Sequence, residues 1–237
     1  DNNQLWSADP LDGVAWGQNP TSRIYTIFEG NYLNWYYGST ITSTRIQIVK
    51  DVATNLLNSV NGVNIGLMRF NYEEGGPVIH AMEDISTGRT GMIAAINDLP
   101  ASGWTPLSES LYEAGQYYAG RDVDYGNVDP LQLSVSSSRS QTDYNVYQSP
   151  MEYGCQKNFT VLLTDGAPTK DFSATTKITA LPGFSSLVGN MCDGSGAGKC
   201  LDDMAHYMHE ADLVDLPGEQ NVTTYTIGFA TDLPILA

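Results

Sequence analysis

The most hydrophobic run of the chain is Phe159-Thr160-Val161-Leu162-Leu163-Thr164, which Asp165-Gly166 follows directly. An unbroken run of apolar and β-branched residues is typical of a parallel strand that is buried on both faces. Ligands of open α/β sheets bind at the carboxyl ends of such strands. Asp165 therefore stands where a binding site is expected, and Gly166 allows a sharp turn and a close approach of a ligand.

Helix and strand patterns alternate on both sides of this run. Apolar residues from Ile46 to Val60 recur at steps of three and four and predict a helix that ends at Asn61-Gly62. Alternating strands and helices predict an α/β sheet with helices on both faces. The remaining predicted strands are 64–70, 77–82 and 222–229, and the remaining predicted helices are 89–99, 108–118 and 201–213.

The composition limits the class of partner. The 237 residues include 11 Lys and Arg against 27 Asp and Glu, a net charge of −16. Such a charge argues against nucleic acid and anionic membranes as partners, because both need a basic surface. No apolar run approaches the roughly 20 residues of a membrane helix, which predicts no direct membrane insertion. Sparse charges, at 16% of residues, and 14 Tyr favour a secreted or surface protein over a cytosolic enzyme.

The chain has three cysteines, and two of them flank a glycine-rich loop. Cys192 and Cys200 bracket residues 193–198, which could bend back so that the two thiols pair. In a secreted protein this pattern favours a local disulfide with Cys155 left over, whereas in a cytosolic protein all three would be reduced thiols. The sequence leaves both alternatives open.

Two oxygen side chains suggest a cation site. Thr105 lies in the loop Gly103-Trp104-Thr105-Pro106-Leu107 ahead of a predicted helix, and Asp165 ends the hydrophobic strand. A hydroxyl and a carboxylate at one sheet edge suit Mg²⁺ or Mn²⁺ better than zinc. From spacing alone, Asp165 could instead cap the next turn and Thr105 could cap its helix. No nucleophile elbow or phosphate-binding loop occurs, so we expect no catalytic residues and no enzyme.

Two weaker metal patterns have simpler explanations. Acidic residues alternate along 122–129 and could wrap Ca²⁺, but a solvated turn gives the same pattern. His206 and His209 lie three apart on a predicted helix and could bind zinc, but the polar face of an ordinary helix gives the same spacing. Neither pattern is predicted to be a site.

The motifs around Thr105 and Asp165 resemble those of a von Willebrand factor A-type domain. The resemblance is carried by Thr164-Asp165-Gly166, by residues 103–107 and by the long helix that leads into Ile65-Gly66-Leu67. Such domains are doubly wound sheets with a metal-ion-dependent adhesion site built from three loops. The loops supply Asp-x-Ser-x-Ser, a Thr and an Asp. Thr105 matches the second loop and Asp165 the third, which implies a divalent cation, Mg²⁺ first and Mn²⁺ or Ca²⁺ as alternatives.

Further segments resemble the PilY/PilC-type family of type IV pilus tip adhesins and biogenesis factors. This resemblance implies a non-enzymatic domain at a bacterial pilus tip or cell surface, exported from the cell. Its metal site would contact protein partners, either minor pilins or a host or surface ligand. The alternative is a structural assembly module that docks minor pilins and has a vestigial metal site. The matching segments are 31–36, 45–51, 66–71, 105–114, 155–159, 200–205 and 224–229.

One element of the family pattern is absent from the chain, because Asp-x-Ser-x-Ser does not occur. In this family it precedes a long aromatic insertion like residues 1–40, which we expect to pack on the domain. Residues 41–237 would form the A-type domain, with inserted loops at about 120–155 and 170–199. The chain then resembles a fragment without its first, central strand and its last elements. Without that strand the sheet would have a gap in its middle, so we expect the strand to be present in the natural protein or to be supplied by another segment.

Overall fold

The computed structural model describes residues 43–128, 133–189 and 192–228. The chain divides into two compact units, residues 1–43 and residues 44–237. The aromatic insertion predicted at 1–40 lies outside the described residues. All described helices and strands belong to the second unit.

The second unit is a mixed α/β structure, as the alternating patterns predict. Its long helices and its strands form at the expected places, with shifted ends. For example, α3 begins at Ile85 rather than at residue 89, because the Asp84 carboxylate accepts a hydrogen bond from the Ser86 amide (2.7 Å) and caps the helix. The elements are α2 (Arg45–Ser59), β1 (Asn64–Met68), β2 (Val78–Asp84), α3 (Ile85–Asn97), α4 (Leu107–Ala119), η1 (Tyr125–Asn127), η2 (Ser136–Ser138), β3 (Asn158–Thr164), α5 (Ala174–Thr179), α6 (Phe184–Leu187), α7 (Leu201–Glu210) and β4 (Val222–Gly228).

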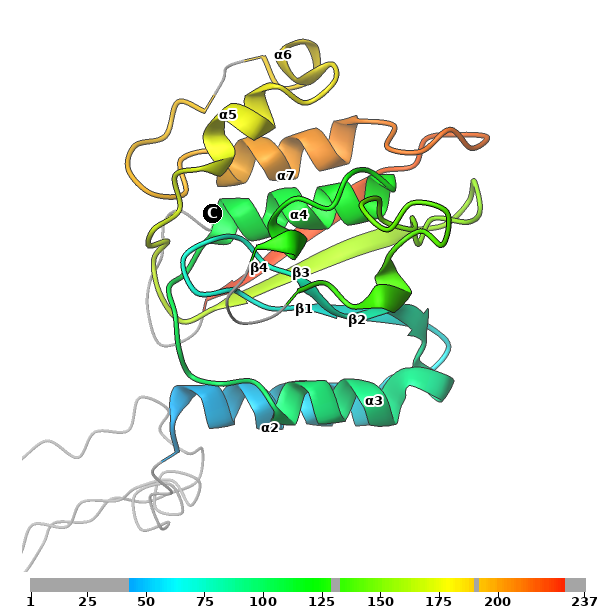
Figure 1. Ribbon diagram of the computed structural model, residues 1–237, viewed down its shortest axis with the longest axis vertical. Helices are drawn as coiled ribbons and strands as arrows, with labels where there is room; N and C mark the ends of the chain where they lie inside the picture. Colours follow the sequence, from blue (N-terminus) through cyan, green and yellow to red (C-terminus); the bar gives the residue numbers. More distant parts are fainter. Residues whose placement is uncertain (1–42, 129–132, 190–191, 229–237) are drawn as a thin grey trace, which may run out of the picture. The chain divides into compact units, whose positions relative to one another are not determined.

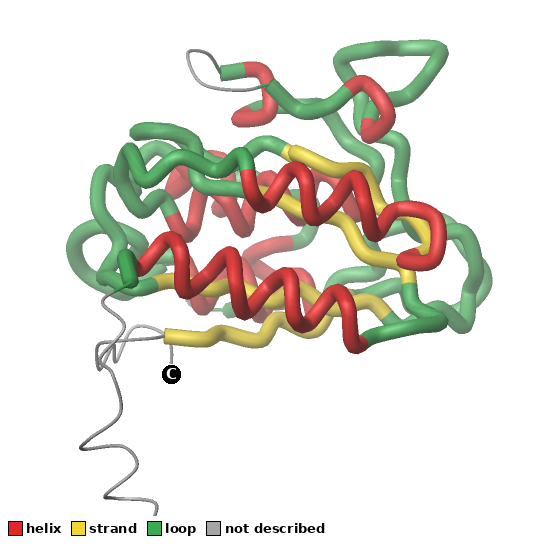
Figure 2. Tube along the Cα trace, turned by 90° about the horizontal axis from the view of Figure 1, so that it is seen from below, coloured by secondary structure: helices red, strands yellow, loops and turns green. Residues whose placement is uncertain are grey.

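The strands form two separate pairs. β1 pairs with β2 in antiparallel fashion, and β3 pairs with β4 in parallel, in register from Asn158 opposite Val222 to Thr164 opposite Gly228. Within the described residues no strand joins the two pairs into one sheet. Figure 2 shows the pairs lying apart behind α2 and α3.

Helices lie on both sides of the strands. In Figure 1, α2 and α3 lie on one side of the strands, and α4 and α7 lie on the other. A small apolar cluster of Leu57, Ile85, Met92 and Ile96 joins α2 to α3. The larger cluster packs α4, α5 and α7 against β3 and β4, and its fully buried members include Leu107, Leu111, Ile178, Phe184, Met204 and Met208.

The expectation that residues 159–164 are buried on both faces is wrong in this structure. Leu162 and Thr164 are buried beneath the helices, but Phe159 and Val161 are 52% and 59% exposed. On the partner strand Val222 is buried, and Tyr225 and Ile227 are exposed together with the rest of the strand's C-terminal half. The physical reason is that α4 and α7 cover one face of the β3–β4 pair, while its other face remains open to solvent.

Substitutions in β3 should report this one-sided burial. We expect Leu162→Thr to lower the free energy of unfolding by about 2 kcal/mol, because an apolar side chain is lost from the core. Val161→Thr keeps the β-branched shape at an exposed position and should change it by less than about 0.5 kcal/mol. Urea unfolding of both variants measures the difference, and equal losses would contradict one-sided burial.

The two predicted insertions contain buried and helical parts. Tyr125 and Tyr147, from the segment expected at about 120–155, are almost fully buried. The segment expected at about 170–199 holds the short helices α5 and α6. A disulfide joins Cys192 to Cys200, which confirms the local pairing, and Cys155 is an exposed free cysteine. Among the described residues, no helix combines the length and apolarity of a membrane span.

Candidate functional site

Asp165 lies directly after β3 and faces the start of α2. Its Oδ2 lies 3.2 Å from Nη1 of Arg45, the first residue of that helix. The same guanidinium nitrogen donates to the Asp165 carbonyl oxygen at 3.4 Å. Both side chains are substantially exposed, at 62% for Arg45 and 41% for Asp165. This ion pair therefore adds little stability, but it places a cation on the predicted metal ligand.

Thr105 lies on the neighbouring loop, ahead of α4. Its backbone amide donates to Thr169 Oγ1 at 2.9 Å, and the Thr169 amide donates to the Thr105 carbonyl at 3.1 Å. Thr169 belongs to the segment that follows Asp165, so this two-way contact holds the two predicted site loops together. The hydrogen bonds between the loops run through Thr169 rather than through Asp165.

The two predicted ligands supply part of a cation site. Thr105 and Asp165 are both half-buried. Divalent cations of the Mg²⁺ or Ca²⁺ type need several oxygen ligands. In residues 43–128, 133–189 and 192–228, no three His, Cys, Asp or Glu side chains gather where they could hold a metal ion. The pair therefore fits such a cation only as a partial ligand set.

The two weaker metal patterns are occupied by other contacts. In the acidic loop, Asp124 Oδ1 lies 2.7 Å from Lys177 Nζ. On α7, His209 Nδ1 lies 2.8 Å from Glu210 Oε1. The His209 contact agrees with a polar helix face. The acidic loop is not simply a solvated turn, because Val123 and Tyr125 are buried.

A buried carboxylate from the Asp165 segment caps α4. Asp171 is 1% exposed. Its Oδ2 accepts from the Ser108 amide at 2.8 Å, and its Oδ1 accepts from Ser108 Oγ at 2.5 Å and from the Glu109 amide at 3.2 Å. Burial raises the pKa of Asp171, and these hydrogen bonds act in the opposite direction. Asp171 thus ties the loop after β3 to the start of α4, just beyond Thr105.

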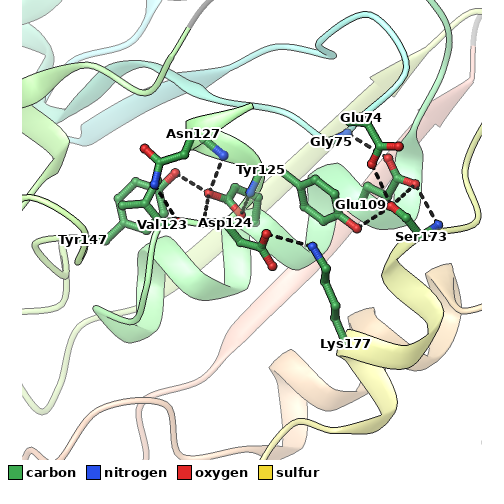
Figure 3. A network of polar contacts seen from close by, with 12 residues as sticks. Glu74, Gly75, Glu109, Val123, Asp124, Tyr125, Asn127, Tyr147, Ser173 and Lys177 are labelled. Carbon is green, nitrogen blue, oxygen red and sulfur yellow. Dashed lines mark hydrogen bonds and ion pairs between the residues drawn. The ribbon is translucent and has the colours of Figure 1, made fainter. Parts of the chain in front are cut away.

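A second buried carboxylate, Glu109, joins two further loops (Figure 3). Its Oε2 accepts from the Gly75 amide at 2.8 Å. Its Oε1 accepts from the amides of Phe172 (3.2 Å) and Ser173 (3.1 Å) and from Ser173 Oγ (2.9 Å). Glu109 is fully buried, and burial raises its pKa. One side chain therefore holds the turn 71–75 against the segment 171–173.

A third carboxylate one helical turn further along, Glu113, fixes the loop around η1. Its Oε1 accepts from the Gly126 amide at 2.8 Å, the Asp124 amide at 3.2 Å and the Tyr147 hydroxyl at 2.6 Å. Its Oε2 accepts from the Tyr125 amide at 2.9 Å. Burial raises the pKa of Glu113 to about 7, against the opposing effect of these hydrogen bonds. Glu113 shapes the loop and faces no solvent.

Sequence reasoning predicts Thr105 and Asp165 as ligands but does not find the residues bonded to them and to their loops. A signal existed for Glu109, because it and Glu113 lie four apart on a helix flanked by apolar residues. Charged residues on a helix that becomes wholly buried need partners. Asp171 and Arg45 carry no comparable signal, since a loop aspartate and a first-turn arginine are common on protein surfaces.

Comparison with known proteins adds no relative. No protein-family model matches the chain, and neither a curated protein nor a solved structure is significantly similar to it. The assignment of a function therefore depends on the motifs and on the geometry described above.

Proposed function

We propose that this chain is most of a von Willebrand factor A-type domain with a doubly wound sheet. The support is the spatial arrangement of the strands. Arg45 at the start of α2 contacts Asp165 at the end of β3, while β1 follows the opposite end of α2, so β1 and β3 run in the same direction (Figure 1). One further parallel strand between β1 and β3 would join both pairs into a single sheet. This is the position that the central strand has in the von Willebrand factor A-type fold.

We also propose that the domain is an adhesion module whose contact is made through a divalent cation. The observation that carries this function is the two-way contact between Thr105 and Thr169, which brings the Thr105 and Asp165 loops to one end of β3. Thr105 and Asp165 would each supply one oxygen ligand. The loop after the central strand, which carries Asp-x-Ser-x-Ser in the resembling family, would supply the remaining protein ligands. When bound, the cation supplies an electrophilic position for a carboxylate of the partner.

Arg45 has a defined role in this proposal. Its guanidinium forms an ion pair with the Asp165 carboxylate and balances its negative charge until a divalent cation takes the place of the guanidinium. Because the pair is exposed, release of Arg45 costs little. The acidic chain, with a net charge of −16, would otherwise repel an acidic partner.

The setting follows from the resemblance of the segments named above to pilus tip proteins. We propose an exported domain at a bacterial pilus tip or cell surface, without catalytic activity, whose partners are minor pilins or a host or surface ligand. The second candidate is an assembly module that docks minor pilins without a functional cation. The observation that favours this second candidate is that Thr105 and Asp165 form only a partial ligand set among the described residues.

Paramagnetic Mn²⁺ tests the cation site. We expect substoichiometric MnCl₂ to broaden the NMR amide signals of residues 103–105 and 164–167 before all others. Asp165→Ala should abolish this selectivity, because it removes the only carboxylate among the two predicted ligands. Asp193→Ala, at an exposed aspartate of the glycine-rich loop, is the matched control and should leave it unchanged. Broadening spread over all acidic surfaces would contradict a defined site.

A further inference from the structure

The Thr105 loop and the two segments bonded to it carry three exposed aromatic side chains. Tyr72, Trp104 and Phe172 are 46%, 43% and 61% exposed. They come from three loops, 71–75, 102–106 and 170–173. Lys170 Nζ lies 5.6 Å from the centroid of the Trp104 ring. We call Tyr72, Trp104, Lys170 and Phe172 the aromatic platform.

The backbone beneath the platform is strained. Tyr72 has a φ of +37° and Lys170 a φ of +57°. Only three non-glycine residues in the described part of the chain have a positive φ, and two of them belong to the platform. Side chains larger than glycine persist in this region only when the surrounding structure enforces it, and such positions cluster at functional sites.

Close backbone packing joins Tyr72 to Trp104. The Trp104 amide donates to the Tyr72 carbonyl at 2.7 Å. Gly103 adopts a φ of +101°, and a Cβ at this position would lie 2.9 Å from the Tyr72 Cα. Glycine is therefore required at 103 for the two aromatic residues to lie on adjoining loops.

Buried carboxylates hold the loops of the platform from below. Glu109 binds the turn that carries Tyr72 through the Gly75 amide, and it binds the loop that carries Phe172 through that residue's own amide. Asp171, between Lys170 and Phe172, is bonded to the first turn of α4. The backbone that presents the aromatic rings is thus fixed in advance, which lowers the entropy cost of binding a partner.

We propose that the aromatic platform binds a peptide segment in which an acidic residue adjoins an aromatic or aliphatic one. Exposed Trp and Tyr side chains supply apolar contact area at interfaces, and the Lys170 ammonium supplies a charged partner for a carboxylate. The chain has only 11 Lys and Arg residues against 27 acidic ones, so most of it repels such a peptide. Lys170 supplies a positive charge beside the Trp104 ring, whereas the turn that carries Tyr72 also holds Glu73 and Glu74, so Lys170 is the one basic side chain of the platform.

This surface adjoins the proposed cation site and does not depend on it. A partner could place one carboxylate on Lys170 and another on the cation, so the platform would determine which acidic proteins bind. The two proposals fail separately, because peptide binding can be measured in EDTA and Mn²⁺ binding can be measured without peptide.

NMR titration of the ¹⁵N-labelled chain in EDTA tests the platform. The Trp104 indole signal is assigned by its loss in Trp104→Phe. We expect the probe peptide acetyl-Gly-Phe-Asp-Gly-amide to shift this signal saturably, and the Asn analogue to bind at least fivefold more weakly. Lys170→Gln should make the two affinities equal. Lys157→Gln, an exposed lysine ahead of β3, should preserve the difference.

Three results would overturn the proposal. One is a Trp104 signal that neither peptide shifts saturably. Another is equal affinity for the Asp and Asn peptides in the unchanged chain, because Lys170 would then contribute no recognition. The third is a saturable shift with the disaccharide N-acetyllactosamine but with no peptide, which would assign the platform to a glycan.

Discussion

Replacing Glu109 by alanine is expected to lower the free energy of unfolding by on the order of 4 kcal/mol. The carboxylate accepts four hydrogen bonds, from the Gly75, Phe172 and Ser173 amides and from Ser173 Oγ. The three amides would be left without this acceptor at about 1 kcal/mol or more each, and the buried side chain would leave a cavity, whereas Ser173 Oγ keeps Glu74 Oε2 at 2.8 Å. Urea unfolding followed by circular dichroism measures the loss.

The matched control is Glu152→Ala, which removes a glutamate from an exposed loop and should cost less than about 0.5 kcal/mol. Glu109→Gln retains one acceptor oxygen and places an amide donor against other donors, so an intermediate loss is expected. A loss below about 1 kcal/mol for Glu109→Ala would show that the four contacts do not hold the loops. The aromatic platform would then lack its proposed support.

The second large effect is a pH dependence that comes from Glu113. Its pKa in the folded protein is about 7, raised chiefly by burial from an ordinary value of 4.5. The folded state therefore binds this proton more tightly than the unfolded state does. The resulting stability is fully present below pH 4.5 and is lost as the pH rises through 7. The change amounts to about 3 kcal/mol.

Equilibrium unfolding in urea at half-unit steps from pH 4.5 to 8 measures this contribution as a difference between variants. Glu113→Gln cannot titrate, so its stability should fall less steeply with rising pH than that of the unchanged chain. Glu152→Gln, at an exposed position, should follow the unchanged chain. Parallel curves for Glu113→Gln and the unchanged chain would show that Glu113 titrates equally in both states.

The parts of the fold that local sequence determines could be predicted. The three- and four-residue spacing of α2, the apolar run of β3 and the β-branched residues of β4 form the expected elements. What one face of a strand packs against is not a local property. The alternation that exposes Phe159 and Val161 depends on which helices cover the β3–β4 pair, and a run of apolar residues does not show this.

The candidate site also has a part that the sequence predicts and a part that it does not. Thr105 and Asp165 could be found because they follow motifs at the ends of predicted elements. Arg45 reaches Asp165 across 120 residues of chain, and Asp171 reaches Ser108 across 63. Such contacts depend on how the elements assemble, so spacing along the chain does not indicate them.

Helix α4 has a consequence for the order in which the chain folds. Residues Leu107 to Tyr118 are all buried, which leaves the helix without a solvent-facing side. Its neighbours include β3 through the bond from Tyr118 to the Phe159 carbonyl, and α7 through Met204 beside Gly115. The last of these segments leaves the ribosome about 5–20 s after α4 at ordinary rates of synthesis. During that interval α4 exposes apolar surface, so we expect chaperones to bind a nascent chain of this protein until α7 has emerged.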